Sequence, residues 1–178
     1  MSIRHFLFSI AFISFLSSSD AGDLSDECVY SLYVQTGTYI TAGTDSKVGV
    51  TLGDRTGKEV QVPELRRWGL MGRDHDYFEG GNLDIFSGRG PCLRLPVCRL
   101  NVTSDGSGHR PGWYCQFIEV TFTGPRKECS QSTFYVDQWL VAGDLTAILD
   151  GCGRRDVTST PLVVRKPIYI GSAASAFQ

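Results

Sequence analysis

The chain has 178 residues, of which 42% are hydrophobic and 20% are charged, and its formal net charge at pH 7 is −2. This length allows one ordinary globular domain, and the apolar content is sufficient for a hydrophobic core. Proteins that bind nucleic acid usually carry a concentrated basic surface, so the weakly acidic balance argues against that class. We therefore expect one folded domain that does not bind nucleic acid.

The first residues have the composition of a secretory signal. Arg4 precedes an apolar run over residues 6–16, and small and polar residues follow it. A run of this length is shorter than the roughly 18–20 residues that cross a bilayer. We predict a signal peptide over residues 1–21 and a short segment over residues 22–27. The mature chain then has no transmembrane segment and enters the secretory pathway, where it stays in the endoplasmic reticulum lumen or is exported to the extracellular space.

Short apolar stretches alternate with turn residues through the rest of the chain. The clearest pattern of period two covers residues 48–52, where every second side chain is apolar. Similar runs between clusters of Gly, Pro, Asp, Asn and Ser predict strands over residues 28–36, 82–86, 113–122, 133–141 and 145–149. No window has a long 3.6-residue period. The fold class that we expect is therefore all-β, an antiparallel sandwich of two sheets.

Two features modify this pattern. Within residues 113–122 the apolar positions change parity between Phe117 and Ile118, as an extra residue at a β-bulge would cause. The segment over residues 153–178 is predominantly basic, and we expect it to be a tail that contributes an edge strand around residues 162–164.

All six cysteines follow the predicted signal peptide, at positions 28, 92, 98, 115, 129 and 152. Disulfides persist in the oxidising secretory pathway, so we expect a disulfide-stapled fold. Cys92 and Cys98 are close enough to close a small loop, and we predict this bridge. The sequence does not decide how the other cysteines, Cys28, Cys115, Cys129 and Cys152, are paired. They form either three bridges in total or two bridges with a free, buried Cys115. No pair of closely spaced Cys-x-x-Cys motifs indicates zinc.

Asn101 begins an Asn-Val-Thr sequon. In a chain that enters the secretory pathway this motif is an acceptor for N-glycosylation. We therefore expect Asn101 to face solvent as an acceptor site for a glycan.

Catalytic motifs are scarce. The sequence contains no Gly-x-Ser-x-Gly elbow and no glycine-rich phosphate loop. His75 and His109 lie in polar stretches that are typical of solvated loops. We predict that the protein is not an enzyme. The alternative is a small hydrolase or a lipoxygenase-accessory enzyme that uses loop carboxylates such as Glu79 and Asp84, and activity that depends on these residues would support it.

Oxygen-bearing residues gather in three predicted turns, over residues 41–45, 79–84 and 104–108. Calcium takes six to eight oxygen ligands from carboxylates, amides and backbone carbonyls, so three such turns at one end of a sandwich can form a calcium site. The alternative is that Asp and Asn beside Gly simply form good turns.

A second candidate surface combines cations with large apolar side chains: Arg66, Arg67, Trp68, Leu70 and Met71. Apolar side chains of this kind can enter the headgroup region of a membrane while the arginines meet phosphates. The alternative is that Trp68 lies buried under an edge of the sandwich.

Several sequence blocks together resemble a known family. The blocks are residues 39–46, residues 77–86, and Asp105-Gly106 with Gly112-Trp113-Tyr114 and Glu119-Val120. They are similar to the three signature blocks of a PLAT (lipoxygenase-homology) domain over residues 28–152. The Cys-Val-Tyr opening at Cys28 and the segment over residues 68–72 resemble the plant single-domain PLAT proteins that are associated with stress responses.

This resemblance implies a β-sandwich of about eight strands, related to the calcium- and lipid-binding domains of lipoxygenases and pancreatic lipases. It also implies that Trp113 is a core residue. In those relatives the domain is not catalytic but brings an attached enzyme to a membrane or a protein partner. We therefore expect a monomer that binds membrane lipid headgroups or a secretory-pathway protein in a plant stress response. The alternative is a disulfide-rich protein-interaction module that does not bind lipid.

The resemblance also implies a calcium site. The first block would supply the Gly43 carbonyl, Thr44 and Asp45. The remaining ligands that the resemblance implies are Glu79, Asn82, Asp84 and Asp105. The sequence departs from the best calcium binders of the family at Thr41, where they can offer a carboxylate, and at Glu79 and Gly80.

Overall fold

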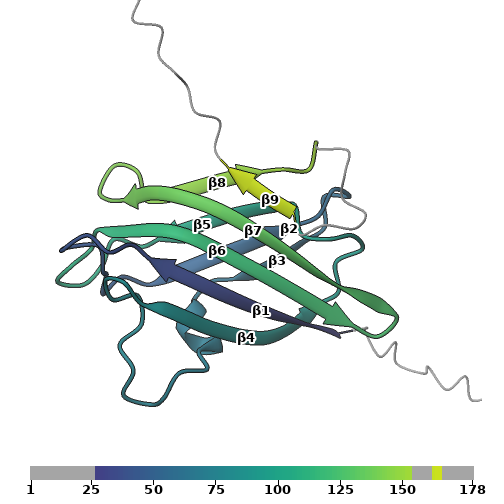
Figure 1. The fold of residues 1–178 in the computed structure, drawn as a ribbon, viewed down its shortest axis with the longest axis horizontal. Helices are drawn as coiled ribbons and strands as arrows, with labels where there is room; N and C mark the ends of the chain where they lie inside the picture. Colours follow the sequence, from purple (N-terminus) through teal and green to yellow (C-terminus); the bar gives the residue numbers. More distant parts are fainter. Residues whose placement is uncertain (1–26, 154–161, 166–178) are drawn as a thin grey trace, which may run out of the picture.

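The computed structural model describes residues 27–153 and 162–165 (Figure 1). This part of the chain contains nine strands and one short 3₁₀ helix. In chain order they are β1 (Glu27–Thr36), β2 (Val48–Gly53), β3 (Glu59–Val62), η1 (Leu65–Trp68), β4 (Leu83–Pro91), β5 (Arg99–Ser104), β6 (Trp113–Gly124), β7 (Lys127–Leu140), β8 (Thr146–Asp150) and β9 (Leu162–Arg165).

The strands form two packed sheets (Figure 1). One sheet has the order β4-β1-β6-β7-β9 and the other has the order β3-β2-β5-β8. All neighbouring strands are antiparallel except β7 and β9, which are parallel. Buried and exposed side chains alternate along β1, since one face of the sheet covers the core. The predicted two-sheet β-sandwich is confirmed.

The predicted bulge is also confirmed. The pairing of β1 with β6 shifts register, since Gln35 faces Phe117 whereas the next residue, Thr36, faces Cys115. Cys115 and Ile118 both point into the core, whereas Phe117 points outward and packs against Tyr135. The extra residue, Gln116, therefore moves the apolar pattern of this strand from one parity to the other.

Aromatic side chains fill the core near the ends of β1, β4 and β6. Trp113 is fully buried, as the family resemblance implied. Its ring lies edge-on to Phe78, which stacks on Phe86. The indole Nε1 donates a hydrogen bond of 3.0 Å to the buried hydroxyl of Thr36, so this polar atom is satisfied inside the core.

The predicted Cys92–Cys98 bridge is wrong. Cys92 instead bonds to Cys28, and Cys98 bonds to Cys152. The reason is topological, since Cys92 follows β4 of one sheet whereas Cys98 precedes β5 of the other. Each bridge joins the ends of two neighbouring strands within one sheet, β1 with β4 and β5 with β8.

The other two cysteines in the described ranges are free. Cys115 is buried and Cys129 is exposed. This agrees with the option of two bridges and a free, buried Cys115. Burial, with a further contribution from the Asp137 carboxylate, raises the pKa of the Cys115 thiol well above its ordinary value.

A buried carboxylate ties the long loops together near the disulfides. Asp54 accepts hydrogen bonds from Thr56 and Lys58 in its own turn and from the backbone N–H groups of Arg94 and Leu95. Burial by itself would raise the pKa of Asp54. The hydrogen bonds, led by that of the Thr56 hydroxyl, outweigh this effect and lower the pKa below its ordinary value.

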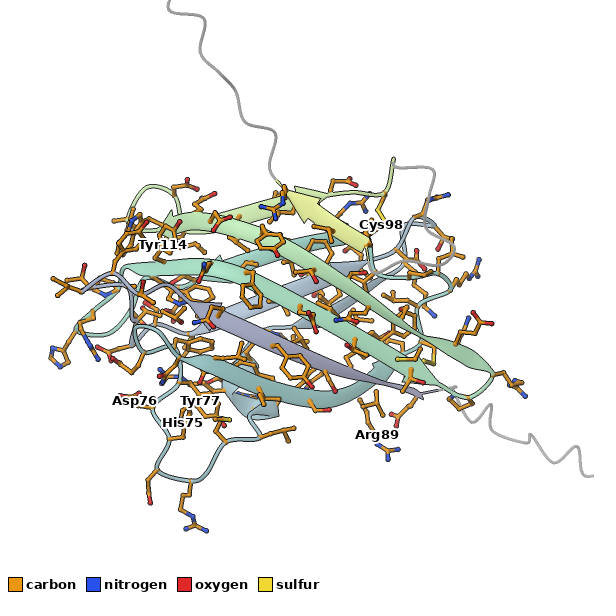
Figure 2. The ribbon with its side chains drawn as sticks, in the orientation of Figure 1. His75, Asp76, Tyr77, Arg89, Cys98 and Tyr114 are labelled. Carbon is orange, nitrogen blue, oxygen red and sulfur yellow. A yellow bond between two sulfur atoms is a disulfide. The ribbon has the colours of Figure 1, made fainter. Side chains whose placement is uncertain are left out.

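The sandwich has two chemically different ends. The disulfide end carries both bridges, since Cys28 opens β1 and Cys98 precedes β5. The loop end carries residues 37–47, 76–82 and 105–112, which connect the opposite ends of the strands. In the view of Figure 2, Tyr114 and Cys98 lie toward these two different ends.

Some predictions fall outside the described residues. These are the signal peptide over residues 1–21, nearly all of the segment over 22–27, and the tail apart from residues 153 and 162–165. The edge strand expected around residues 162–164 is confirmed as β9. No helix within the described ranges is long and apolar enough to cross a membrane.

Candidate functional site

Three loops meet at the loop end of the sandwich. The backbone N–H of Thr44 donates to the Phe78 carbonyl at 3.1 Å, which joins the first loop to the second. The N–H of Asp45 and the hydroxyl of Thr44 both donate to the Arg110 carbonyl, at 3.1 and 2.8 Å, which joins the first loop to the third. A side chain at Gly43 would press against the backbone of Glu79 and Gly80, so the close approach of the first two loops favours glycine there.

A guanidinium lies between two of the predicted calcium ligands. Arg110 hydrogen-bonds to both carboxylate oxygens of Glu79, and its Nη2 lies 3.6 Å from Oδ1 of Asp45. The backbone N–H of Arg110 donates to the other oxygen of Asp45 at 3.0 Å. The hydrogen bonds and charge of Glu79, followed by the charge of Asp45, raise the pKa of Arg110 above its ordinary value.

Asp84 serves a different purpose. Its buried carboxylate accepts the backbone N–H of Phe78 at 2.6 Å and lies 2.6 Å from Nε2 of His75. Figure 2 shows His75 next to Asp76 and Tyr77 at this side of the molecule. Asp84 therefore fixes the second loop from the inside.

Asp105 closes a turn. Its Oδ1 accepts hydrogen bonds from the N–H of Lys47 and from the N–H and the hydroxyl of Ser107. These bonds, led by the Ser107 hydroxyl, lower the pKa of Asp105. The amide nitrogen of Asn82 donates to the Asp76 carbonyl at 3.4 Å. Both residues therefore have partners within their own turns, as the alternative of good turn formers predicted.

The arrangement does not fit a calcium ion. Calcium takes six to eight oxygen ligands, whereas Asp45 and Glu79 share one guanidinium, and Asp84 and Asp105 are engaged elsewhere. Within residues 27–153 and 162–165, no group of three or more His, Cys, Asp or Glu side chains is placed to hold a metal.

A cluster of exposed and half-buried apolar side chains lies at the loop end, and we call it the aromatic tip. Its members are Tyr39, Ile40, Tyr114, Trp139 and Val141. The Tyr39 ring lies 4.8 Å from the Tyr114 ring, which lies 5.4 Å from the Trp139 ring. Ile40 is fully exposed, and 57% of the surface of Tyr39 is exposed. Sequence reasoning placed Tyr39 and Ile40 within a family block and missed this surface. The signal available was an apolar pair inside a turn, between Gly37 and Gly43.

The second predicted surface, from Arg66 to Met71, lies along the edge of β4. Trp68 is half-buried there and packs on Gly88, where a Cβ atom would overlap the indole. The N–H of Leu70 donates to the Ile85 carbonyl at 2.9 Å, so the segment extends the sheet edge. The expectation that Trp68 lies under a sandwich edge describes this position better than an exposed membrane anchor.

The remaining members of this segment differ in exposure. Arg66 lies over the Phe78 ring at 5.7 Å, and Arg67 is exposed and paired with Glu64. The N–H of Met71 donates to the Tyr77 hydroxyl, whereas 61% of the surface of Leu70 is exposed. Arg67 and Trp68 also line an open groove beside β3. Arg67, in its exposed ion pair, and Leu70 are therefore the members of this segment most accessible to a ligand.

Asn101 lies in the middle of β5, between Thr51 and Ile148 on the neighbouring strands. Its side chain is half-buried on the face opposite to the buried Leu100 and Val102. Its Oδ1 has no hydrogen-bond partner within the described part of the chain. The outward direction agrees with the sequon, and the glycan itself stays a prediction.

The histidine environment offers no nucleophile. In the region that the structure describes, no Ser, Thr or Cys side chain is hydrogen-bonded to His75, whose ring meets Asp84 and lies edge-on to Tyr77. A hydrolase of the Ser–His–Asp type needs the nucleophile within hydrogen-bond reach of its base. The contact with His75 therefore gives the buried Asp84 carboxylate a structural partner.

The fold is that of a PLAT-type β-sandwich. The structure superposes on coral 8R-lipoxygenase, described as activated by calcium via a C2-like domain, with a TM-score of 0.51 at 19% identity. It superposes on a calcium-dependent 11R-lipoxygenase with a TM-score of 0.50 at 18% identity. The matches cover 68% of this chain but only 16% and 17% of the two lipoxygenases, so the likeness concerns the fold alone.

Sequence comparison is more specific. Residues 14–143 match the family model described as Embryo-specific protein 3 (ATS3). The chain is 47% identical to PLAT domain-containing protein 1 of Arabidopsis thaliana, over 71% of this chain and 72% of that protein. It is 42% identical to PLAT domain-containing protein 2 of the same plant, over 83% of each. The chain belongs to the ATS3 family, among the single-domain PLAT proteins of plants.

Proposed function

We propose that this protein is a non-enzymatic binding module that docks on membrane lipid headgroups through the aromatic tip. The observation that carries this proposal is the exposure of Tyr39 and Ile40 beside Tyr114 and Trp139, at the end of the sandwich where three loops meet. Tyrosine and tryptophan favour the membrane–water interface, because their rings are apolar on one side and polar on the other.

Contacts with Tyr114 hold the loop that carries the tip. Tyr39 packs on the Tyr114 ring, and the N–H of Gly37 donates to the Tyr114 carbonyl at 3.0 Å. On the other side of Ile40, the N–H of Tyr114 donates to the Ala42 carbonyl at 2.9 Å, so the loop that carries Ile40 is held at both of its flanks. Full burial of an isoleucine side chain contributes about 1.5–3 kcal/mol, which corresponds to roughly a tenfold to hundredfold change in affinity.

The experiment is co-sedimentation of the oxidised protein with phosphatidylcholine vesicles and with vesicles that also contain phosphatidylserine. Each binding curve is measured with calcium and with chelator. We expect Ile40→Ser to weaken binding about tenfold or more, because the substitution removes one side chain from the apolar contact. Tyr39→Ser should have a similar effect.

Two matched variants test the location. Ile148→Ser changes the same residue type at 61% exposure, on the outer face of β8. Leu70→Ser changes an equally exposed residue on the second predicted surface. Neither should alter binding. A loss with Leu70→Ser but not with Ile40→Ser would move the docking site to the Arg66–Met71 segment, and absence of any vesicle binding would favour a protein partner.

Localisation and physiology complete the proposal. A signal peptide over residues 1–21 would deliver the protein to the endoplasmic reticulum lumen or to the extracellular space, where the two disulfides persist. The names of the plant relatives describe a domain and no reaction, which supports a binding role without catalysis. We place this binding role in a plant stress response, on the family resemblance described above.

A further inference from the structure

The loop end contains a cation of its own. Nη2 of Arg110 contacts Oε1 of Glu79 and lies 3.6 Å from Oδ1 of Asp45, while Nη1 donates to Oε2 of Glu79 at 3.1 Å. A single nitrogen therefore bridges two carboxylates that come from two different loops. The guanidinium therefore neutralises the two carboxylates, as a bound metal ion would.

The backbone directs the guanidinium to this position. The Arg110 carbonyl accepts two hydrogen bonds from the first loop, and the Arg110 N–H donates to Oδ2 of Asp45. Gly108, with a φ of +89°, brings the third loop so close that a Cβ atom there would overlap Asp45. Asp45 therefore holds the main chain of Arg110 and also faces its guanidinium.

A divalent cation would have to displace the guanidinium before it could use Asp45 and Glu79. The nearby carboxylates of Asp84 and Asp105 offer little help, because each already accepts short hydrogen bonds from its own turn. The displaced Arg110 would leave a positive charge next to the incoming ion. Two of these effects, the competition for Asp45 and Glu79 and the remaining positive charge, come from the Arg110 guanidinium itself and disappear when that group is removed.

We propose that Arg110 is a tethered cation that takes the place of calcium at the loop end. It joins the loops over residues 37–47, 76–82 and 105–112 in one arrangement without any metal. These loops and the adjoining strands carry the aromatic tip. The tip then keeps the same arrangement whether or not calcium is present. The inference concerns metal binding and loop order, and it does not depend on what the tip binds.

The test compares calcium binding by the wild-type protein and by Arg110→Gln, which removes the guanidinium from Asp45 and Glu79 and keeps the backbone hydrogen bond to Asp45. Both are stripped with chelator and then titrated with calcium, with magnesium as the control ion, while the melting temperature Tm and the heat of binding are recorded. Wild-type Tm should not change. Arg110→Gln should gain a saturable calcium response, about 3–5 °C when calcium reaches ~10 times its Kd.

Arg67→Gln is the matched control, because Arg67 is also an exposed arginine in an ion pair but lies away from the loop end. It should respond to calcium as the wild type does. Exposed ion pairs contribute little to stability, so both variants should fold. Arg110→Lys, which retains the charge, should also remain unresponsive.

Two results would overturn the proposal. The first is a calcium response of the wild type that equals that of Arg110→Gln, since the guanidinium would then not compete with the metal. The second is a folded Arg110→Gln variant that shows no calcium response by either measurement, since removing the tethered cation would then open no cation site.

Discussion

Removal of the disulfides tests the connectivity with a predictable magnitude. Cys98 and Cys152 are 54 residues apart, and Cys28 and Cys92 are 64 residues apart. In the chain-entropy description, cross-links that close loops of these lengths each stabilise a protein by about 4 kcal/mol at 25 °C. We therefore expect the double variants Cys98→Ala/Cys152→Ala and Cys28→Ala/Cys92→Ala to lose similar free energies of unfolding, each about 4 kcal/mol plus the packing of the buried sulfurs.

The decisive variant is Cys92→Ala/Cys98→Ala. It removes both bridges of the structure and should lose about 8 kcal/mol, or fail to fold, whereas a Cys92–Cys98 bridge closing a small loop would contribute only about 2 kcal/mol. Urea unfolding without reductant, followed by fluorescence, measures the three losses. Cys129→Ala, at an exposed free thiol, is the control and should change stability by less than ~0.5 kcal/mol. A Cys92→Ala/Cys98→Ala variant more stable than the other two would refute the connectivity.

Three further predictions concern two buried polar side chains and the two free thiols. Thr36→Val leaves the buried N–H of Trp113 without its acceptor, and urea unfolding should show a loss of about 1–3 kcal/mol. Because folding lowers the pKa of Asp54, its stabilising effect is present above the pKa of the unfolded chain and is lost as the pH falls through the folded pKa. Asp54→Asn should therefore flatten the decline of stability below pH ~4, and an unchanged acid slope would contradict this role. In the native protein a thiol reagent should label Cys129 rapidly and Cys115 only after unfolding, which mass spectrometry of the two peptides can distinguish.

Strands could be predicted where apolar and polar residues alternate regularly over a long stretch. β1, β2 and β6 were expected nearly at their observed bounds, and even the bulge in β6 was visible as a change of parity. β3 and β5 were not predicted. β3 has only four residues between turns, and β5 alternates Leu100 and Val102 with polar residues that were interpreted as a glycosylation sequon.

The disulfides show why proximity in sequence misleads. Cys92 and Cys98 are near each other along the chain, but the chain crosses from one sheet to the other between them. Pairing is decided by which strands become neighbours, and that information resides in the register of β1 with β4 and of β5 with β8. Alternation alone does not supply strand order.

The candidate site was predicted in part for a similar reason. Composition placed Asp45 and Glu79 in turns, and the family blocks placed these turns at one end of the fold. No motif singled out Arg110, because its role depends on a contact between three loops that are far apart in the sequence. Likewise, exposure of Ile40 depends on its neighbours in space and not on its residue type.

The separation of the two ends of the sandwich also determines which part of the protein lies away from a surface bound at the aromatic tip. β1 has ten residues, so it spans about 30 Å from the disulfide end to the loop end. A molecule that docks by its aromatic tip, as proposed, holds residue 27 at the opposite end of β1 from the docking surface. Cys129, exposed at the same far end, can carry a fluorophore, and energy transfer from it to dye-labelled lipids reports the height at which the protein stands.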